Sequence, residues 1–198
     1  MTATTATHTT RESWLIAAVE ALTPMFTELG HEVPPVRISV GFPSGKGSRA
    51  KAIGQCWHGS AAADGLGQVF VSPILGDVID VLETVAHELV HAINHANGDN
   101  GHGRPFAKIA KKLGFEAPMT SSPASEELKA KLREIAAGLG EYPHAALTDA
   151  VLTIKKQGTR MLLVKCPDDE CGYQVRTTAK WLAIGVPTCP CGEEMEEA

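Results

Sequence analysis

Residues 84 to 106 of this 198-residue chain read TVAHELVHAINHANGDNGHGRPF and hold four of its 8 histidines. His87, Glu88 and His91 form an HExxH motif within a segment of strongly helical apolar spacing. Histidines at positions i and i+4 project from one face of a helix, so both imidazoles can reach a single zinc ion. Glu88 would then face a metal-activated water, accept its proton as the water attacks a carbonyl, and pass a proton to the leaving amine. The motif predicts a zinc hydrolase with Glu88 as general base.

A third metal ligand must come from elsewhere in the chain. His95 lies on the same helical face, but it is two turns from His87, about 11 Å along a straight helix, which is too far for one tetrahedral ion. Two candidates lie downstream, His102 and Glu116. His102 is the better placed, because the Asn- and Gly-rich residues 96–101 end the helix and let the chain turn back, whereas Glu116 lies beyond a further helix.

The C-terminal region carries a second group of candidate ligands. Cys166, Cys171, Cys189 and Cys191 lie in the segments CPDDECG and CPCG. The polar N-terminus has no apolar export signal, so we expect a cytoplasmic protein, in which clustered cysteines favour metal ligation over disulfides. Four thiolates form a closed structural zinc site, although both spacings differ from the usual CxxC. The alternative is a set of thiols without metal, and Cys56 is expected to be a small buried side chain.

The apolar spacing predicts an α+β framework around these residues. The expected helices are residues 13–29, 76–96, 104–113 and 125–140, and the expected strands are residues 36–40, 53–57 and 68–72. Asp77 and Ser125 are suited to cap the second and fourth helices. The fourth helix is amphipathic, which is typical of a linker helix resting on a core and also of a helix that binds a partner.

Composition and the positions of Pro-, Gly- and Ser-rich segments indicate how the chain is organised. We expect a disordered tail at residues 1–12, a catalytic domain at 13–116, a linker with a helix at 117–159, and a β-rich cysteine module with an acidic tail at 160–198. The net charge of −5 argues against a chain that binds nucleic acid over its whole surface. No run of about 18 apolar residues occurs, so no membrane span is expected.

The segment HELVHA, followed by a Gly/Asn loop and HGRPF, strongly resembles the SprT-like (Spartan-like) zinc metallopeptidases. Their pattern is HExxH, a short loop, and an HG-x-x-F/W element that supplies the third ligand. The resemblance covers most of residues 14 to 192, including QVFVSPILGD before the motif, FAKIAKKLGF after it, and the cysteine module. It implies a small zincin-type catalytic domain, with a short mixed sheet and the HExxH helix, followed by a linker helix and a β-rich zinc ribbon.

Carried over to this sequence, the resemblance implies that His87, His91 and His102 hold a catalytic zinc and that Glu88 is the base. His95 matches no functional position of the family. The same resemblance implies an edge strand at residues 68–72 that pairs with an extended substrate peptide.

The implied function is a zinc-dependent endopeptidase that acts on DNA-associated or DNA-crosslinked proteins, as in DNA–protein crosslink repair. Tyr173 and Trp181, beside Arg176 and Lys180, could stack on single-stranded DNA, although nearby acidic residues counter that charge. Two alternatives stay open: a nucleic-acid-associated zinc-binding protein with little proteolytic turnover, and a zinc hydrolase of a non-peptide amide.

Overall fold

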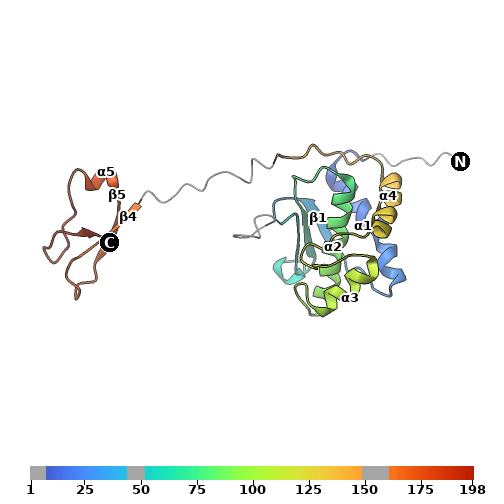
Figure 1. Cartoon of the computed structure of the whole chain (residues 1–198), viewed down its shortest axis with the longest axis horizontal. Coiled ribbons are helices and arrows are strands. Elements are labelled where there is room, and N and C mark those ends of the chain that lie inside the picture. Colours follow the sequence, from blue (N-terminus) through green and yellow to red (C-terminus); the bar gives the residue numbers. More distant parts are fainter. Residues whose placement is uncertain (1–7, 44–51, 149–160) are drawn as a thin grey trace. The chain divides into compact units, whose positions relative to one another are not determined.

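The computed structural model of the chain describes residues 8–43, 52–148 and 161–198. The chain divides into two compact units, with the boundary between Leu152 and Thr153 (Figure 1). Among the described residues, no helix is long and apolar enough to cross a membrane.

The first unit combines four helices with a three-stranded sheet. Its elements are α1 (Arg11–Glu28), β1 (Val36–Val40), β2 (Gly54–Trp57), the 3-10 turn η2 (Gly59–Ala61), β3 (Gly67–Val71), α2 (Val78–Ala96), α3 (Arg104–Leu113) and α4 (Glu126–Leu139). The strand order is β1-β3-β2, with β1 parallel and β2 antiparallel to β3. The α+β class and the approximate positions of these helices and strands are therefore confirmed.

The strand order corrects one expectation. Residues 68–72 are not an edge strand, because β3 pairs with β1 on one side and with β2 on the other. The edges of the sheet are β1 and β2, and β2 is the edge strand that packs against α2.

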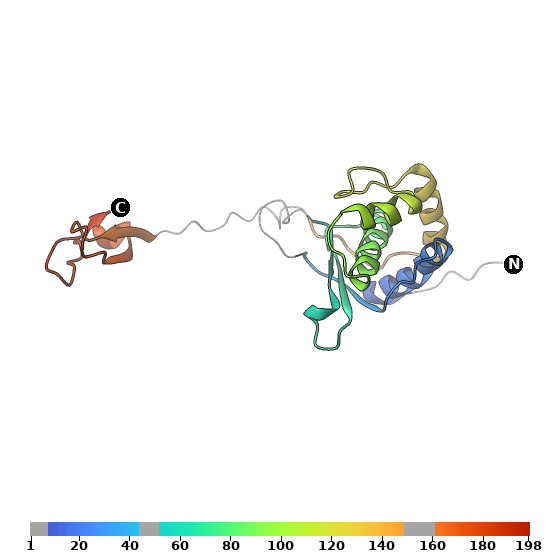
Figure 2. The same ribbon diagram turned by 90° about the horizontal axis from the view of Figure 1, so that it is seen from below.

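Helix α2 is the central element of the first unit. It packs against β2, β3, α1, α3 and α4, and in both views it lies between the strands and α4 (Figures 1 and 2). Asp77 caps its N-terminus, as expected, by accepting from the backbone N–H groups of Ile79 and Asp80. Most of its apolar side chains are buried, Leu82 and Leu89 fully, so the helix is held by packing on several sides.

Helix α4 belongs to the same core. Its residues Leu128, Leu132 and Leu139 are buried, and it packs on α1 and α2. The cap predicted at Ser125 forms, with the hydroxyl accepting from the N–H of Leu128. This helix, placed by the sequence in a linker, is therefore part of the compact first unit.

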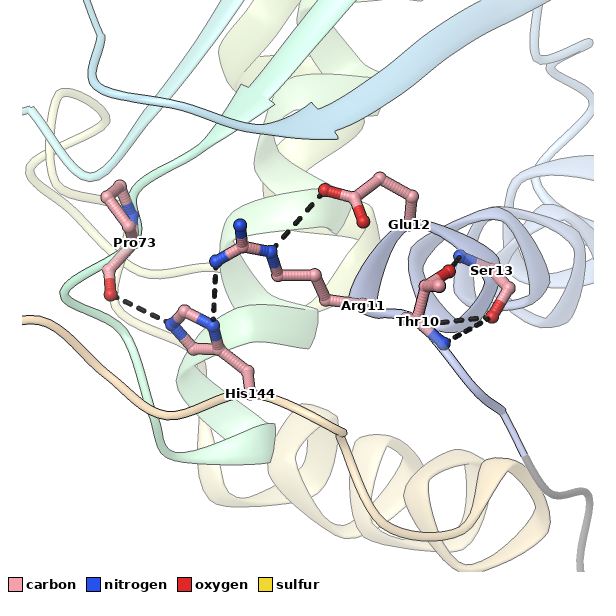
Figure 3. A network of polar contacts seen from close by, with 6 residues as sticks. All are labelled: Thr10, Arg11, Glu12, Ser13, Pro73 and His144. Carbon is pink, nitrogen blue, oxygen red and sulfur yellow. Dashed lines mark hydrogen bonds and ion pairs between the residues drawn. The ribbon is translucent and has the colours of Figure 1, made fainter.

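The chain after α4 returns to α1 and to the turn before α2. Trp14 donates its indole N–H to the carbonyl of Gly140, and its ring lies 4.8 Å from that of Tyr142. His144 then bridges Arg11 of α1 and the carbonyl of Pro73, at 3.2 and 2.8 Å (Figure 3). Since Pro73 lies between β3 and α2, this network ties the approach to α2 to the start of α1.

The start of α1 differs slightly from expectation. Thr10 and Ser13 form a reciprocal capping box, so the helix begins at Arg11 rather than at 13 (Figure 3). Residues 11 and 12, expected in the tail, are thus helical. Residues 8–10 precede the helix, with Thr10 as its N-cap, and residues 1–7 of the expected tail lie outside the described residues.

The second unit is small and β-rich, as expected. It contains β4 (Met161–Lys165), β5 (Gln174–Thr178), α5 (Ala179–Leu182) and β6 (Glu196–Glu197), in an antiparallel sheet of order β5-β4-β6. Its buried core consists of Val164, Cys166, Cys189 and Met195. A core this small, half of it cysteine, supplies little apolar burial to stabilise a fold.

Candidate active site

Three histidines from two segments meet at one point. The Nε2 atom of His102 lies 3.1 Å from that of His87 and 3.1 Å from that of His91. Ligand atoms of all three side chains lie within 4.8 Å of one another. Imidazole nitrogens gathered in this way can hold a metal ion, since each presents a lone pair once its proton is on the other nitrogen.

The loop after α2 brings His102 to this point. Helix α2 ends at Ala96, and Gly98 and Gly101 adopt positive φ angles of 75° and 73°. A residue with a β-carbon is strained in this left-handed conformation, so the glycines allow the chain to reverse within a few residues. His102 then precedes α3, whose N-cap is Gly103.

The ring of Phe106 packs against the three imidazoles. Its fully buried ring lies 4.9 Å from that of His87, 4.5 Å from that of His91 and 4.8 Å from that of His102, measured between centroids. The ring therefore packs on all three side chains and restricts their orientation. No separate role was predicted for Phe106, although it is the last residue of the HGRPF segment.

Burial keeps the histidines neutral. It lowers the pKa of His87 to about 4 and that of His91 to about 3, and repulsion among the imidazoles adds to both shifts. Burial also lowers the pKa of His102. At neutral pH these side chains are therefore unprotonated, which is the form that binds a metal.

Glu88 lies beside this group with only 5% of its surface exposed. Burial raises its pKa to about 8 in the metal-free chain, and a hydrogen bond from the backbone of Cys56 opposes the shift. A cation near the carboxyl would lower this pKa again, because the opposite charge favours the ionised form. Metal binding therefore favours the carboxylate that a general base requires.

The candidate active site opens into a cavity of about 700 Å³. Its walls are residues 52–56 along β2, the face of α2 that carries Thr84, Glu88 and the histidines, residues 101–102, and residues 120–122. The group thus lies on the floor of a groove between an edge strand and a helix, where a ligand of considerable size can reach it.

The other two ligand candidates remain apart from the group. His95 lies in the cavity wall, with its Nδ1 atom 3.8 Å from the sulfur of Cys56 and its ring 6.1 Å from that of His91. Glu116 is exposed and does not line the cavity. Cys56, expected to be buried, is half-buried at the edge of the core.

The second unit gathers its four cysteines. Sulfur atoms lie 3.5 Å apart between Cys166 and Cys191 and between Cys171 and Cys189, and all four lie within 4.8 Å of one another. Along the chain, Cys171 and Cys191 are each followed by a glycine at positive φ, Gly172 and Gly192, which turns the chain back. The four cysteines can therefore hold a metal ion despite their irregular spacing.

The protonation of these thiols is uneven. Burial raises the pKa values of Cys166 and Cys189, whereas a hydrogen bond from the backbone of Glu193, with help from the neighbouring thiols, lowers that of Cys191. Of these three thiols Cys191 ionises most readily, and a metal would displace the remaining protons.

The chain matches no protein-family model, no curated protein and no solved structure.

The histidine group predicts which substitution removes a metal ion. His102→Ala should reduce the metal content of the whole protein by about one ion, because one of three ligands is lost. His95→Ala is the matched control and should retain the full content. Elemental analysis of the purified variants measures the metal content. Loss of an ion in His95→Ala but not in His102→Ala would show that His95 is the third ligand.

The cysteine group predicts selective loss of the second unit. Cys189→Ser should release one metal ion and unfold residues 161–198, since the remaining core is too small to fold alone. The first unit should keep its fold and its metal. Backbone amide NMR spectra report the two units separately, and a folded second unit without metal would show that apolar packing suffices.

The buried carboxyl predicts a pH-dependent effect on the metal-free protein. An unfolded Glu ionises above about pH 4.5, whereas Glu88 in the folded chain stays protonated up to about pH 8. Stability is therefore lost as pH rises between these values, and Glu88→Gln removes that loss. The variant's gain in unfolding free energy should grow from pH 5 to pH 8, by on the order of a few kcal/mol. Denaturation in chelator at several pH values measures it; a pH-independent difference would contradict the buried, neutral carboxyl.

Proposed function

We propose that this chain is a zinc-dependent endopeptidase of the SprT-like type. The observation that carries the proposal is the buried carboxyl of Glu88 beside the group of His87, His91 and His102, on the floor of an open groove. A structural site needs no acid beside it and no access for a large ligand. A carboxyl, a metal group and an open groove together are the parts of a hydrolytic site.

Zinc fits the donors of both groups. A tetrahedral zinc with bonds of about 2.0–2.1 Å to nitrogen separates its ligands by about 3.3 Å, close to the 3.1 Å between the imidazole nitrogens. With bonds of about 2.3 Å to sulfur, the separation becomes about 3.8 Å, close to the 3.5 Å between the cysteine sulfurs. Three nitrogens leave a fourth position open, as in catalytic sites, and four sulfurs close the shell, as in zinc ribbons.

Zinc, when bound, supplies a Lewis acid that polarises a carbonyl and makes a water more acidic. The remaining steps fall to Glu88. Its carboxylate takes the proton of the attacking water and then gives a proton to the leaving amine as the peptide bond breaks. The burial that raises the pKa of Glu88 also makes it a stronger base than an exposed glutamate.

The edge strand favours a peptide over a smaller amide. The N–H of Ser72 donates to the carbonyl of Ile53 at 2.8 Å, which places Ile53 among the residues that bond to β3. By the alternation of antiparallel strands, Gly54 and Cys56 turn their backbone groups away from β3, toward the cavity. An extended peptide that pairs along this edge would pass over the histidine group. The role first expected for residues 68–72 is therefore proposed for β2.

The cavity also favours substrates with basic side chains. Asp80 and Glu83 line it, two to three turns before His91 along α2. One carboxyl oxygen of Glu83 is buried without a hydrogen-bond partner among the described residues, and burial raises its pKa. A lysine or arginine of a bound peptide would pair with it. This supports DNA-associated proteins, which are rich in basic residues, as the substrate class.

The charge of residues 161–198 does not favour direct contact with DNA. In residues 161–198, three basic side chains face seven acidic ones, which lowers the attraction to phosphate. Trp181 is 56% exposed with the Lys180 ammonium 4.9 Å from its ring, and Tyr173 is also exposed, so stacking on single-stranded bases is the available contact. Three further basic residues, Lys155, Lys156 and Arg160, lie outside the described residues.

Removing the base tests the enzymatic proposal. Glu88→Gln should keep both metal ions and lower peptide hydrolysis by roughly 10²–10⁴-fold, because proton transfer is lost and the ligands are not. Cleavage of casein or of a basic peptide, with and without single-stranded DNA, measures the effect. Equal activity of wild type and variant would sink the proposal, and a wild type that binds DNA without cleaving would favour a nucleic-acid-associated binding protein.

A further inference from the structure

The edge strand β2 lies close against α2 at Gly54. A β-carbon at this position would lie 2.5 Å from Oε1 of Glu88, 3.0 Å from its Cγ, and 2.6 Å from the Cγ2 methyl of Thr84. Contacts this short do not occur in folded proteins, so an alanine here must displace the carboxyl or the helix. The glycine is needed for space, since its φ angle is not in the left-handed region.

The next outward-facing residue of the same strand holds the same carboxyl. Cys56 follows Gly54 by two positions, so its backbone also turns away from β3. Its backbone hydrogen-bonds to the carboxyl of Glu88. The carboxyl therefore packs against the backbone of residue 54 and accepts a hydrogen bond from the backbone of residue 56. Glu88, the candidate base, thus belongs to α2 and is positioned by the backbone of β2.

We propose that Gly54 is a positioning residue for the general base, and that together with the backbone of Cys56 it forms a seat for the carboxyl of Glu88. The inference rests on the proposed endopeptidase function for its catalytic consequence. The seat belongs to the strand on which the substrate peptide is proposed to pair. The backbone of β2 would therefore position both Glu88 and the scissile bond of the substrate. A shift of residue 54 would move the carboxyl of Glu88 relative to the substrate and to the histidine group.

The catalytic test replaces Gly54 and leaves the ligands in place. Gly54→Ala should retain both metal ions, keep KM within about twofold, and lower kcat by roughly 100-fold, the loss that a displacement of about 1 Å can cause. Gly67→Ala is the matched control in the same sheet. Its added carbon meets only a Val36 methyl at 3.3 Å and the Trp57 carbonyl at 3.6 Å, so its kcat should stay near that of the wild type.

A double substitution separates positioning from a general defect. In Glu88→Gln, where the base is already lost, Gly54→Ala should lower the residual kcat by less than about threefold. A kcat for Gly54→Ala within twofold of the wild type, or an equal further loss in the Glu88→Gln protein, would overturn the inference.

A stability measurement tests the seat without any turnover. Thr84→Ser removes the second obstructing methyl and serves as the common background, since its hydroxyl can still bond to the carbonyl of Asp80. In this background Gly54→Ala should lower the Tm markedly when Glu88 is present. In a protein that also carries Glu88→Ala, the same substitution should lower the Tm by less than half as much, because the truncated side chain no longer meets the new carbon. Equal losses would overturn the seat. If the wild type cleaves no peptide, the proposed function fails, while this cycle still decides the geometry.

Discussion

The first unit depends on one electrostatic constraint: three imidazoles and a carboxyl are gathered out of water without a charge to balance them. Each histidine loses its protonated form and Glu88 loses its ionised form on burial, so the metal-free group is neutral and poorly solvated. A divalent cation reverses both penalties, because it bonds to the neutral imidazoles and stabilises the carboxylate. The group is therefore far better explained as a binding site than as packing.

Holding such a group requires a rigid framework around α2. The helix is enclosed by the sheet and by α1, α3 and α4, so its apolar residues fix the rotation that directs His87 and His91 into the cavity. Phe106 supports the imidazoles from α3, and the His144 network fixes the turn that leads into α2. Most of the first unit thus positions two turns of one helix. Even α4, which touches no ligand, contributes by completing the core on which that helix rests.

Features of the site that depend on local sequence could be predicted. The HExxH spacing on a helix, the Asp77 and Ser125 caps and the glycine-rich reversal before His102 are all readable from neighbouring residues, and the helices and strands lie close to their expected ranges. Features that depend on pairing distant segments could not. The order β1-β3-β2 makes residues 68–72 central, because the hydrophobic pattern of a short strand does not show how many neighbours it has. The same holds for Gly54, whose importance arises only where β2 meets Glu88 and Thr84.

The two metal groups show why ligand type and burial should be considered together. In the second unit the four sulfurs lie within 4.8 Å of one another and two of the cysteines form half of the buried core, so a metal there would make up for the scarce apolar packing. In the first unit the core is complete without the histidines, and the group lies at the floor of a cavity beside an acid and an edge strand. The apolar core of the first unit therefore does not depend on a metal at the histidine group, which is consistent with the hydrolytic role proposed for that group. The backbone of β2 also contributes, since the missing β-carbon at residue 54 leaves room for the methyl group of Thr84 and for the carboxyl of Glu88, the proposed base.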